Sequence, residues 1–150
     1  MTTMAADPVF LDTSLLVAAS VKLHPGNQAA RAYLTKLAER ETPTCISPQV
    51  CREFLVVLTR QPVEGRRFSV EEGLAALDEW LQSCSVVDED EEVVVELHRL
   101  VQRYQVKGKP VHDCNIVATM LTHDIKRLGT RNAADFDRYE PEIGVDAVTP

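Results

Sequence analysis

The sequence lacks any arrangement of cysteine and histidine that is typical of a zinc site. Its four cysteines form no Cys-x-x-Cys pair, and none stands at a metal-ligand spacing from a histidine. Each lies in an apolar or helix-like context, which favours buried free thiols in a reducing compartment over disulfide bonds. The four are Cys45, Cys51, Cys84 and Cys114. The sequence therefore predicts neither a structural zinc site nor a disulfide framework.

Long apolar runs and an excess of basic charge are also missing. No stretch approaches the roughly 18 apolar residues of a transmembrane helix, and no basic-then-apolar leader precedes Asp7. The formal net charge is −7 at pH 7. That charge argues against a broad nucleic-acid-coating surface, but not against an RNA enzyme with a local basic rim. We therefore expect a cytoplasmic protein with no membrane partner.

What remains is an ordinary globular composition, with 45% hydrophobic and 26% charged residues in 150. We find no internal repeat and no linker, so we expect one domain over residues 1–150. Ser47-Pro48, and Ser69 followed by Glu72, mark two helix starts. Strands are expected at 9–11, 44–46, 85–87, 127–130 and 145–148, and helices at 13–21, 27–40, 48–59, 70–82, 91–104 and 111–123. This alternation indicates parallel strands in a layered α/β fold.

Four acidic residues fall where such a fold can bring them together. Asp12 ends the first strand, and Glu53 lies at the edge of the apolar stripe of its helix. Asp113 lies in the first turn of another helix, and Asp135 follows the fourth strand. Ligands of open α/β sheets bind at the carboxyl ends of the strands. A carboxylate cluster without cysteine or histidine ligands is the kind of site that holds Mg²⁺ or Mn²⁺.

Each acid also has a purely structural interpretation. Asp12 suits the N-cap of the following helix, and Asp113 complements a helix dipole. Glu53 suits a solvated helix edge, and Asp135 suits a turn or the cap of a short helix. Glu53 is the most informative of the four, because a carboxylate beside the core needs a partner or a metal. The residues alone leave both interpretations open.

The order and context of these acids resemble those of PIN-domain ribonucleases, in particular the VapC-type toxins of type II toxin–antitoxin pairs. The resemblance spans nearly the whole chain, and the last two of its four motifs are the most specific. The motifs are Phe10-Leu11-Asp12-Thr13-Ser14, Arg52-Glu53-Phe54, His112-Asp113-Cys114-Asn115-Ile116-Val117-Ala118-Thr119 and Thr130-Arg131-Asn132-Ala133-Ala134-Asp135-Phe136.

That resemblance implies a PIN-like three-layer α/β/α sandwich with a mostly parallel central sheet of four to five strands. It implies an endoribonuclease, dependent on Mg²⁺ or Mn²⁺, that hydrolyses RNA phosphodiester bonds with a metal-activated water. It also implies a cognate antitoxin protein as inhibitor and a homodimer. By motif position, Asp12, Glu53 and Asp113 are the implied metal ligands and, together with Asp135, the implied catalytic acids.

Three polar residues near these acids are implied to orient water or phosphate: Thr13, Ser14 and Asn132. Some relatives carry an acid at the position of Asn132, so either Asn132 or Asp135 fills the fourth position of the site. The choice decides whether one metal ion or two can be held.

Basic residues in three loops are candidates for an RNA-binding rim. Each could equally be a solubilising surface charge or part of an antitoxin interface. The candidates are Arg60, Arg66, Arg67, Lys107, Lys109, Arg127 and Arg131. Surplus apolar residues at 55–58 and 93–95 indicate a further partner or dimer surface.

Other functions fit the sequence less well. A phosphatase of the haloacid dehalogenase type needs an aspartate where Ser14 stands, and a receiver domain needs an acidic neighbour beside Asp12. The stronger alternative is a non-catalytic PIN-like module that binds RNA or a protein. Loss of the acids would indicate such a module, and at least three are present.

Overall fold

The structure, a computed structural model, describes residues 6–150, so residues 1–5 of the predicted domain lie outside the described residues. Within that range five strands form one parallel sheet in the order β3-β2-β1-β4-β5. The strands are β1 (Val9–Leu11), β2 (Thr44–Ile46), β3 (Ser85–Val86), β4 (Arg127–Thr130) and β5 (Gly144–Ala147). The predicted parallel sheet is confirmed.

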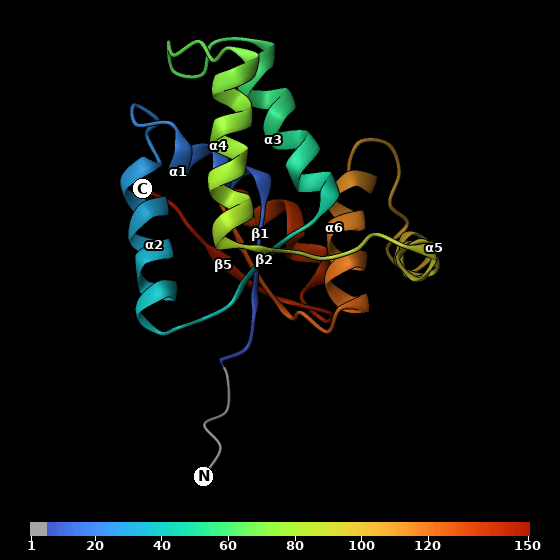
Figure 1. The fold of residues 1–150 in the computed structure, drawn as a ribbon. Coiled ribbons are helices and arrows are strands. Elements are labelled where there is room, and N and C mark those ends of the chain that lie inside the picture. The colour runs from blue at the N-terminus through green and yellow to red at the C-terminus, as the bar shows by residue number, and fades with distance from the viewer. Residues whose placement is uncertain (1–5) are drawn as a thin grey trace.

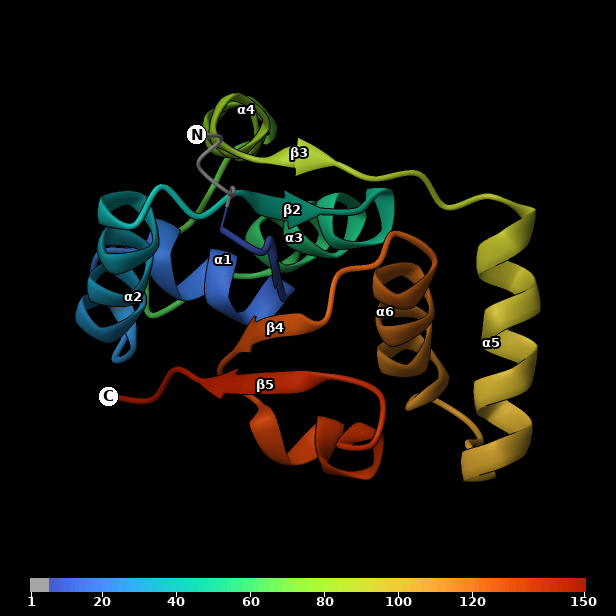
Figure 2. The same ribbon diagram turned by 90° about the horizontal axis from the view of Figure 1, so that it is seen from below.

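Helices cover both faces of this sheet. They are α1 (Thr13–Ser20), α2 (Asn27–Glu39), α3 (Pro48–Arg60), α4 (Val70–Ser83), α5 (Glu91–Tyr104), α6 (Val111–Thr122) and the 3₁₀ helix η1 (Ala133–Tyr139). Figure 2 shows α1 and α2 on one side of the sheet, and α5 and α6 on the other. α3 packs on α1 and on α4, and the α3–α4 hairpin rises beyond the end of the sheet in Figure 1. The expected three-layer α/β/α sandwich is therefore confirmed.

Local sequence signals begin the two hairpin helices where predicted. Ser47 Oγ accepts a hydrogen bond from the Val50 amide at 3.4 Å, and Pro48 takes the first helical position of α3. Ser69 and Glu72 form a reciprocal capping box at the start of α4. Both helix starts therefore have partners for backbone amides that would otherwise have none.

The core passes through both faces of the sheet. All three residues of β1 are buried, as expected for the central strand of a covered sheet. Phe10 of β1, Phe54 of α3 and Phe136 of η1 are each at most 1% exposed. In residues 6–150 no helix combines the length and apolar character needed to cross a membrane.

Some details differ from the expectations. β3 ends at Val86, one residue before the predicted end, and is an exposed sheet edge. β5 begins and ends one residue before the predicted 145–148, because the Gly144 amide already donates to the Lys126 carbonyl at 2.7 Å. All four cysteines are free, as expected, but the prediction that all are buried is wrong. Cys51 and Cys84 are half-buried, because they pack at the margin of the core rather than within it.

Candidate active site at the carboxyl ends of the strands

Asp12 lies at the carboxyl end of the central strand, between β1 and α1, and is 6% exposed. Its Oδ1 accepts a hydrogen bond from the Thr13 amide at 2.9 Å, so Asp12 does cap α1. Its Oδ2 accepts two more, from Ser14 Oγ at 3.0 Å and from Thr130 Oγ1 at 2.7 Å. Three donors therefore hold a buried carboxylate at the edge where parallel α/β sheets bind ligands.

The two hydroxyls have little freedom to do anything else. Ser14 Oγ accepts the Arg131 amide at 3.1 Å, and Thr130 Oγ1 accepts the Asn132 amide at 3.0 Å. Because each hydroxyl has a single hydrogen, these acceptor bonds leave that hydrogen for Asp12. Thr130 begins the last of the four motifs, but the sequence alone predicts no role for it in the site. Its signal is the last position of β4, the strand that pairs with β1 through Leu11 and Gly129.

Glu53 lies on α3, half-buried beside the apolar stripe, as its helical spacing predicted. Thr13 Oγ1 lies 3.5 Å from Glu53 Oε1, at the outer limit of a hydrogen bond. Burial raises the pKa of Glu53 above its usual range, and the charge of Asp12 raises it further. Asp12 itself has a raised pKa, mainly through burial and despite its three hydrogen bonds. The two carboxylates are therefore electrostatic neighbours.

Asp113, in the first turn of α6, completes the group. Burial, followed by the charges of Asp12, Asp135 and Glu53, raises its pKa to about 7. Asp135 lies on η1 and is exposed; it contributes its charge from the open side of the site. It lies within the short helix rather than at its cap, which is Asn132. The fold thus brings Asp113 within electrostatic reach of the other three acids, which lie on three separate segments.

The donor set suits a hard divalent cation in kind but is not gathered around one point. Every candidate ligand is a carboxylate oxygen; burial, and to a lesser degree the charges of neighbouring acids, raise the pKa values of three of them, and a bound cation would offset both effects. Across residues 6–150, however, no group of three or more Asp, Glu, His or Cys side chains is placed so that it could hold a metal ion. Metal binding would therefore require side-chain movement at this site.

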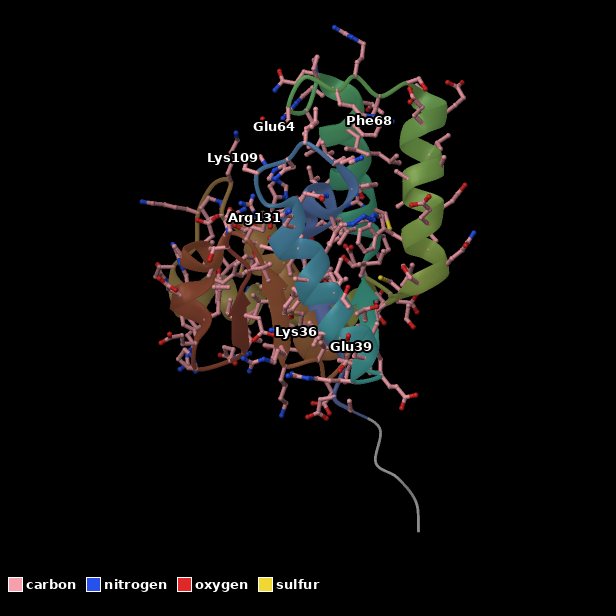
Figure 3. All side chains as sticks on the ribbon, turned by 90° about the vertical axis from the view of Figure 1, so that its left-hand side faces the viewer. Lys36, Glu39, Glu64, Phe68, Lys109 and Arg131 are labelled. Carbon is pink, nitrogen blue, oxygen red and sulfur yellow. The ribbon has the colours of Figure 1, made fainter. Side chains whose placement is uncertain are left out.

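Two of the basic residues considered for an RNA-binding rim lie toward one end of the molecule. Figure 3 shows Lys109 and Arg131 toward the end that carries Glu64 and Phe68, away from Lys36 and Glu39. Arg131 packs against the α1–α2 loop, where a Cβ on Gly26 would clash with its guanidinium group. That Nε is buried and has no hydrogen-bond partner among residues 6–150.

A groove of about 880 Å³ lies between α1, α2 and α4, separate from the acids, and the loop before α4 contributes to its lining. Its lining includes the aromatic side chains of Phe68 and Trp80 and the charged side chains of Arg31, Arg66 and Glu79. Trp80 Nε1 donates to Ser20 Oγ at 2.8 Å, which fixes the indole against α1. None of the four carboxylates lines this groove.

Comparisons with known proteins agree with this arrangement. A family model described as the PIN domain matches residues 9–140. VapBC2 from Rickettsia felis, solved with a promoter DNA fragment, has a chain with a TM-score of 0.70 and 19% identity, covering 93% of this chain and 98% of its own. A toxin–antitoxin complex from Klebsiella pneumoniae gives 0.66 and 22%, covering 94% and 98%.

A third structure is VapC20 from Mycobacterium tuberculosis, a toxin that cleaves the sarcin–ricin loop. It gives a TM-score of 0.61 and 19% identity, covering 80% of this chain and 86% of its own. At such identities these structures show a shared fold. The comparison with curated protein sequences gave no match.

Proposed function

The chain belongs to the PIN domain family, and from that membership we propose that it is an endoribonuclease dependent on Mg²⁺ or Mn²⁺, acting as the toxin of a toxin–antitoxin pair. The observation that carries the proposal is the gathering of Asp12, Glu53 and Asp135 around the half-buried Asp113, whose pKa burial and these three charges raise to about 7. Such a group is costly to maintain without a cation or a catalytic task. The place of action would be the cytoplasm, where RNA substrate is found.

In this proposal Asp12, Glu53 and Asp113 would hold the cation, and Asp135 would act as the fourth acid. When bound, a divalent cation supplies positive charge against the scissile phosphate and lowers the pKa of an attacking water. Thr130 and Ser14 hold Asp12 in place through its Oδ2. The protein's own contribution would therefore be to hold the acids in position against their repulsion.

The remaining polar residues would handle the substrate. Asn132 would orient water or a phosphate oxygen from the start of η1. Lys107 and Lys109, exposed in the α5–α6 loop, and Arg66 and Arg67, exposed in the α3–α4 loop, would contact the RNA backbone. Phosphate contacts made by rim cations increase affinity with little dependence on base sequence.

The test is cleavage of an RNA pool by purified protein with Mg²⁺ or Mn²⁺. Wild-type protein should release fragments with 5′-phosphate and 3′-hydroxyl ends, and EDTA should stop it. Asp12→Asn should remove cleavage, whereas Asp137→Asn, which changes an exposed acid of η1, should not. If the protein binds RNA but does not cleave it with either cation, the chain is a PIN-like binding module rather than a nuclease.

For the partner, we propose that the groove between α1, α2 and α4 receives a segment of the cognate antitoxin. Its lining combines aromatic and aliphatic side chains with polar side chains and charges of both signs, which suits an amphipathic peptide. The exposed apolar side chains of Val70, Leu74 and Leu81, which share one face of α4, lie outside the groove lining and are the candidate homodimer surface.

The antitoxin proposal is tested with the product of a small neighbouring reading frame, co-expressed with the chain. Ala75→Arg, which places a long charged side chain in the groove, should abolish co-purification. Gln82→Arg adds the same charge to an exposed position of α4 outside the groove lining and should leave the complex intact. If both variants co-purify with the antitoxin equally well, the groove is not part of the interface.

A further inference from the structure

Gln49 is a buried polar residue that the site described so far does not use. It lies on α3, one turn before Glu53, and the residue is only 4% exposed. Its Nε2 donates to the His112 carbonyl at 2.8 Å, and its Oε1 accepts from Asn115 Nδ2 at 2.7 Å. Both partners flank Asp113 in the first turn of α6. The Gln49 side chain therefore connects the helix of Glu53 directly to the turn that carries Asp113.

The Glu89 carboxylate contacts both Gln49 and Asn115. Glu89, in the segment between β3 and α5, accepts the Gln49 backbone amide through Oε1 at 2.6 Å. Its Oε2 lies 3.4 Å from Asn115 Nδ2. The Asn115 amide is thus shared between Gln49 and Glu89. Gln49, Asn115 and Glu89 form a closed polar bridge, which we call the Gln49 bridge.

The bridge matters because little else joins these two helices. α3 packs mainly on α1 and α4, whereas α6 packs mainly on α5. Glu53 and Asp113 therefore stand on helices whose main packing partners are different. A buried amide with donor and acceptor both bonded fixes distance and orientation, because breaking either bond leaves an unpaired buried polar group.

We propose that Gln49 is a positioning residue that sets the placement of Asp113 relative to Glu53 through the Gln49 bridge. This inference rests on the proposed metal-dependent nuclease function. The bridge is the means by which the chain holds in place two acids that lie on different helices and repel each other. Groups that orient metal ligands without touching the metal commonly change metal affinity or activity by about 10–100-fold when they are removed.

The test compares Gln49→Met, which keeps the length of the side chain and removes both polar atoms, with a matched control. Tyr33→Phe also removes one side-chain hydrogen bond between elements, from Tyr33 Oη to Asp146 Oδ2 at 2.8 Å, but from α2 to β5. Three quantities are measured for each variant: the Kd for Mn²⁺ by electron paramagnetic resonance, kcat and KM on an RNA oligonucleotide, and amide hydrogen exchange of metal-free protein at Cys114 and Asn115.

For Gln49→Met we expect the Kd for Mn²⁺ to rise about tenfold and kcat to fall about tenfold, with KM for RNA within about twofold of wild type. Exchange at Cys114 and Asn115 should accelerate about tenfold, because the turn has lost its anchor. Tyr33→Phe should leave all three quantities at wild-type values. If Gln49→Met does not fold, Asn115→Ala carries the same test with losses of about fivefold, because it removes the bond to Gln49 Oε1 and the longer contact with Glu89 Oε2.

The outcomes separate the two proposals. Wild-type cleavage together with unchanged Mn²⁺ affinity, kcat and exchange in Gln49→Met would overturn the positioning role and leave the nuclease intact. A wild-type protein that neither binds Mn²⁺ nor cleaves RNA would overturn the nuclease. In that case, faster exchange at Cys114 and Asn115 in Gln49→Met would still support the positioning of the Asp113 turn, and unchanged exchange would refute it.

Discussion

Replacing Asp113 by asparagine should stabilise the metal-free protein while removing its proposed activity. In the folded state, burial and three neighbouring acids raise the Asp113 pKa to about 7, against about 3.9 in an unfolded chain. A shift of this size corresponds to at most about 4 kcal/mol at 1.36 kcal/mol per pKa unit. Because Asp113 is only half-buried, solvent screening reduces this to about 2 kcal/mol. The asparagine variant does not ionise, so it avoids that cost.

The sign of the pH dependence follows from the raised pKa. Below about pH 4 the carboxyl is protonated in both states, so wild type and Asp113→Asn should be about equally stable. As the pH rises from about 4 to 7 the unfolded chain gives up its proton first, and the wild type should lose stability relative to the variant. Above pH 7 the difference should stay constant at its maximum.

The assay is thermal and urea unfolding in EDTA at pH 4, 6 and 8. At pH 8 the variant should melt about 4–8 °C above wild type, as expected for about 2 kcal/mol in a chain of this size. Asp137→Asn is the control, because it makes the same aspartate-to-asparagine change at an exposed position of η1. A variant no more stable than wild type at pH 8, or a difference that does not grow with pH, would refute the electrostatic reasoning.

Three further outcomes are expected. Mg²⁺ or Mn²⁺ should raise the Tm of wild type at pH 8, and the rise should be much smaller for Asp12→Asn in the same thermal scan; equal shifts would place the cation elsewhere. Thr130→Val removes the 2.7 Å bond to Asp12 and should lower kcat about tenfold, whereas Thr122→Val at the far end of α6 should not; steady-state cleavage kinetics decide it. Lys109→Ala should raise KM for RNA at 50 mM salt and matter less at 200 mM, because phosphate contacts are screened.

Much of the fold could be predicted because its signals are local. The apolar run of β1, the Ser47-Pro48 start and the Ser69–Glu72 capping box each act within a few residues, and the structure has each where expected. β3 was less well placed, since a two-residue exposed edge strand carries little hydrophobic pattern. The half-burial of Cys51 depends on what packs against α3, which local sequence does not state.

The candidate site was predictable only in part for the same reason. Asp12 and Glu53 have local cues, a strand end and the edge of an apolar stripe, and the structure places both near Asp113. Thr130 reaches Asp12 only through the pairing of β4 with β1, and Gln49 reaches α6 only through the tertiary fold. Neither contact leaves a periodic signal in the chain.

The most direct test of the central claim is anomalous diffraction from crystals of wild-type protein grown with Mn²⁺. The proposal predicts an anomalous peak within about 2.0–2.4 Å of carboxylate oxygens of Asp12 and Asp113, with the side chains closer together than they are in this structure. A peak at other residues, or no peak in protein that cleaves RNA equally well in EDTA, would contradict the assignment of these acids as a metal-dependent nuclease site.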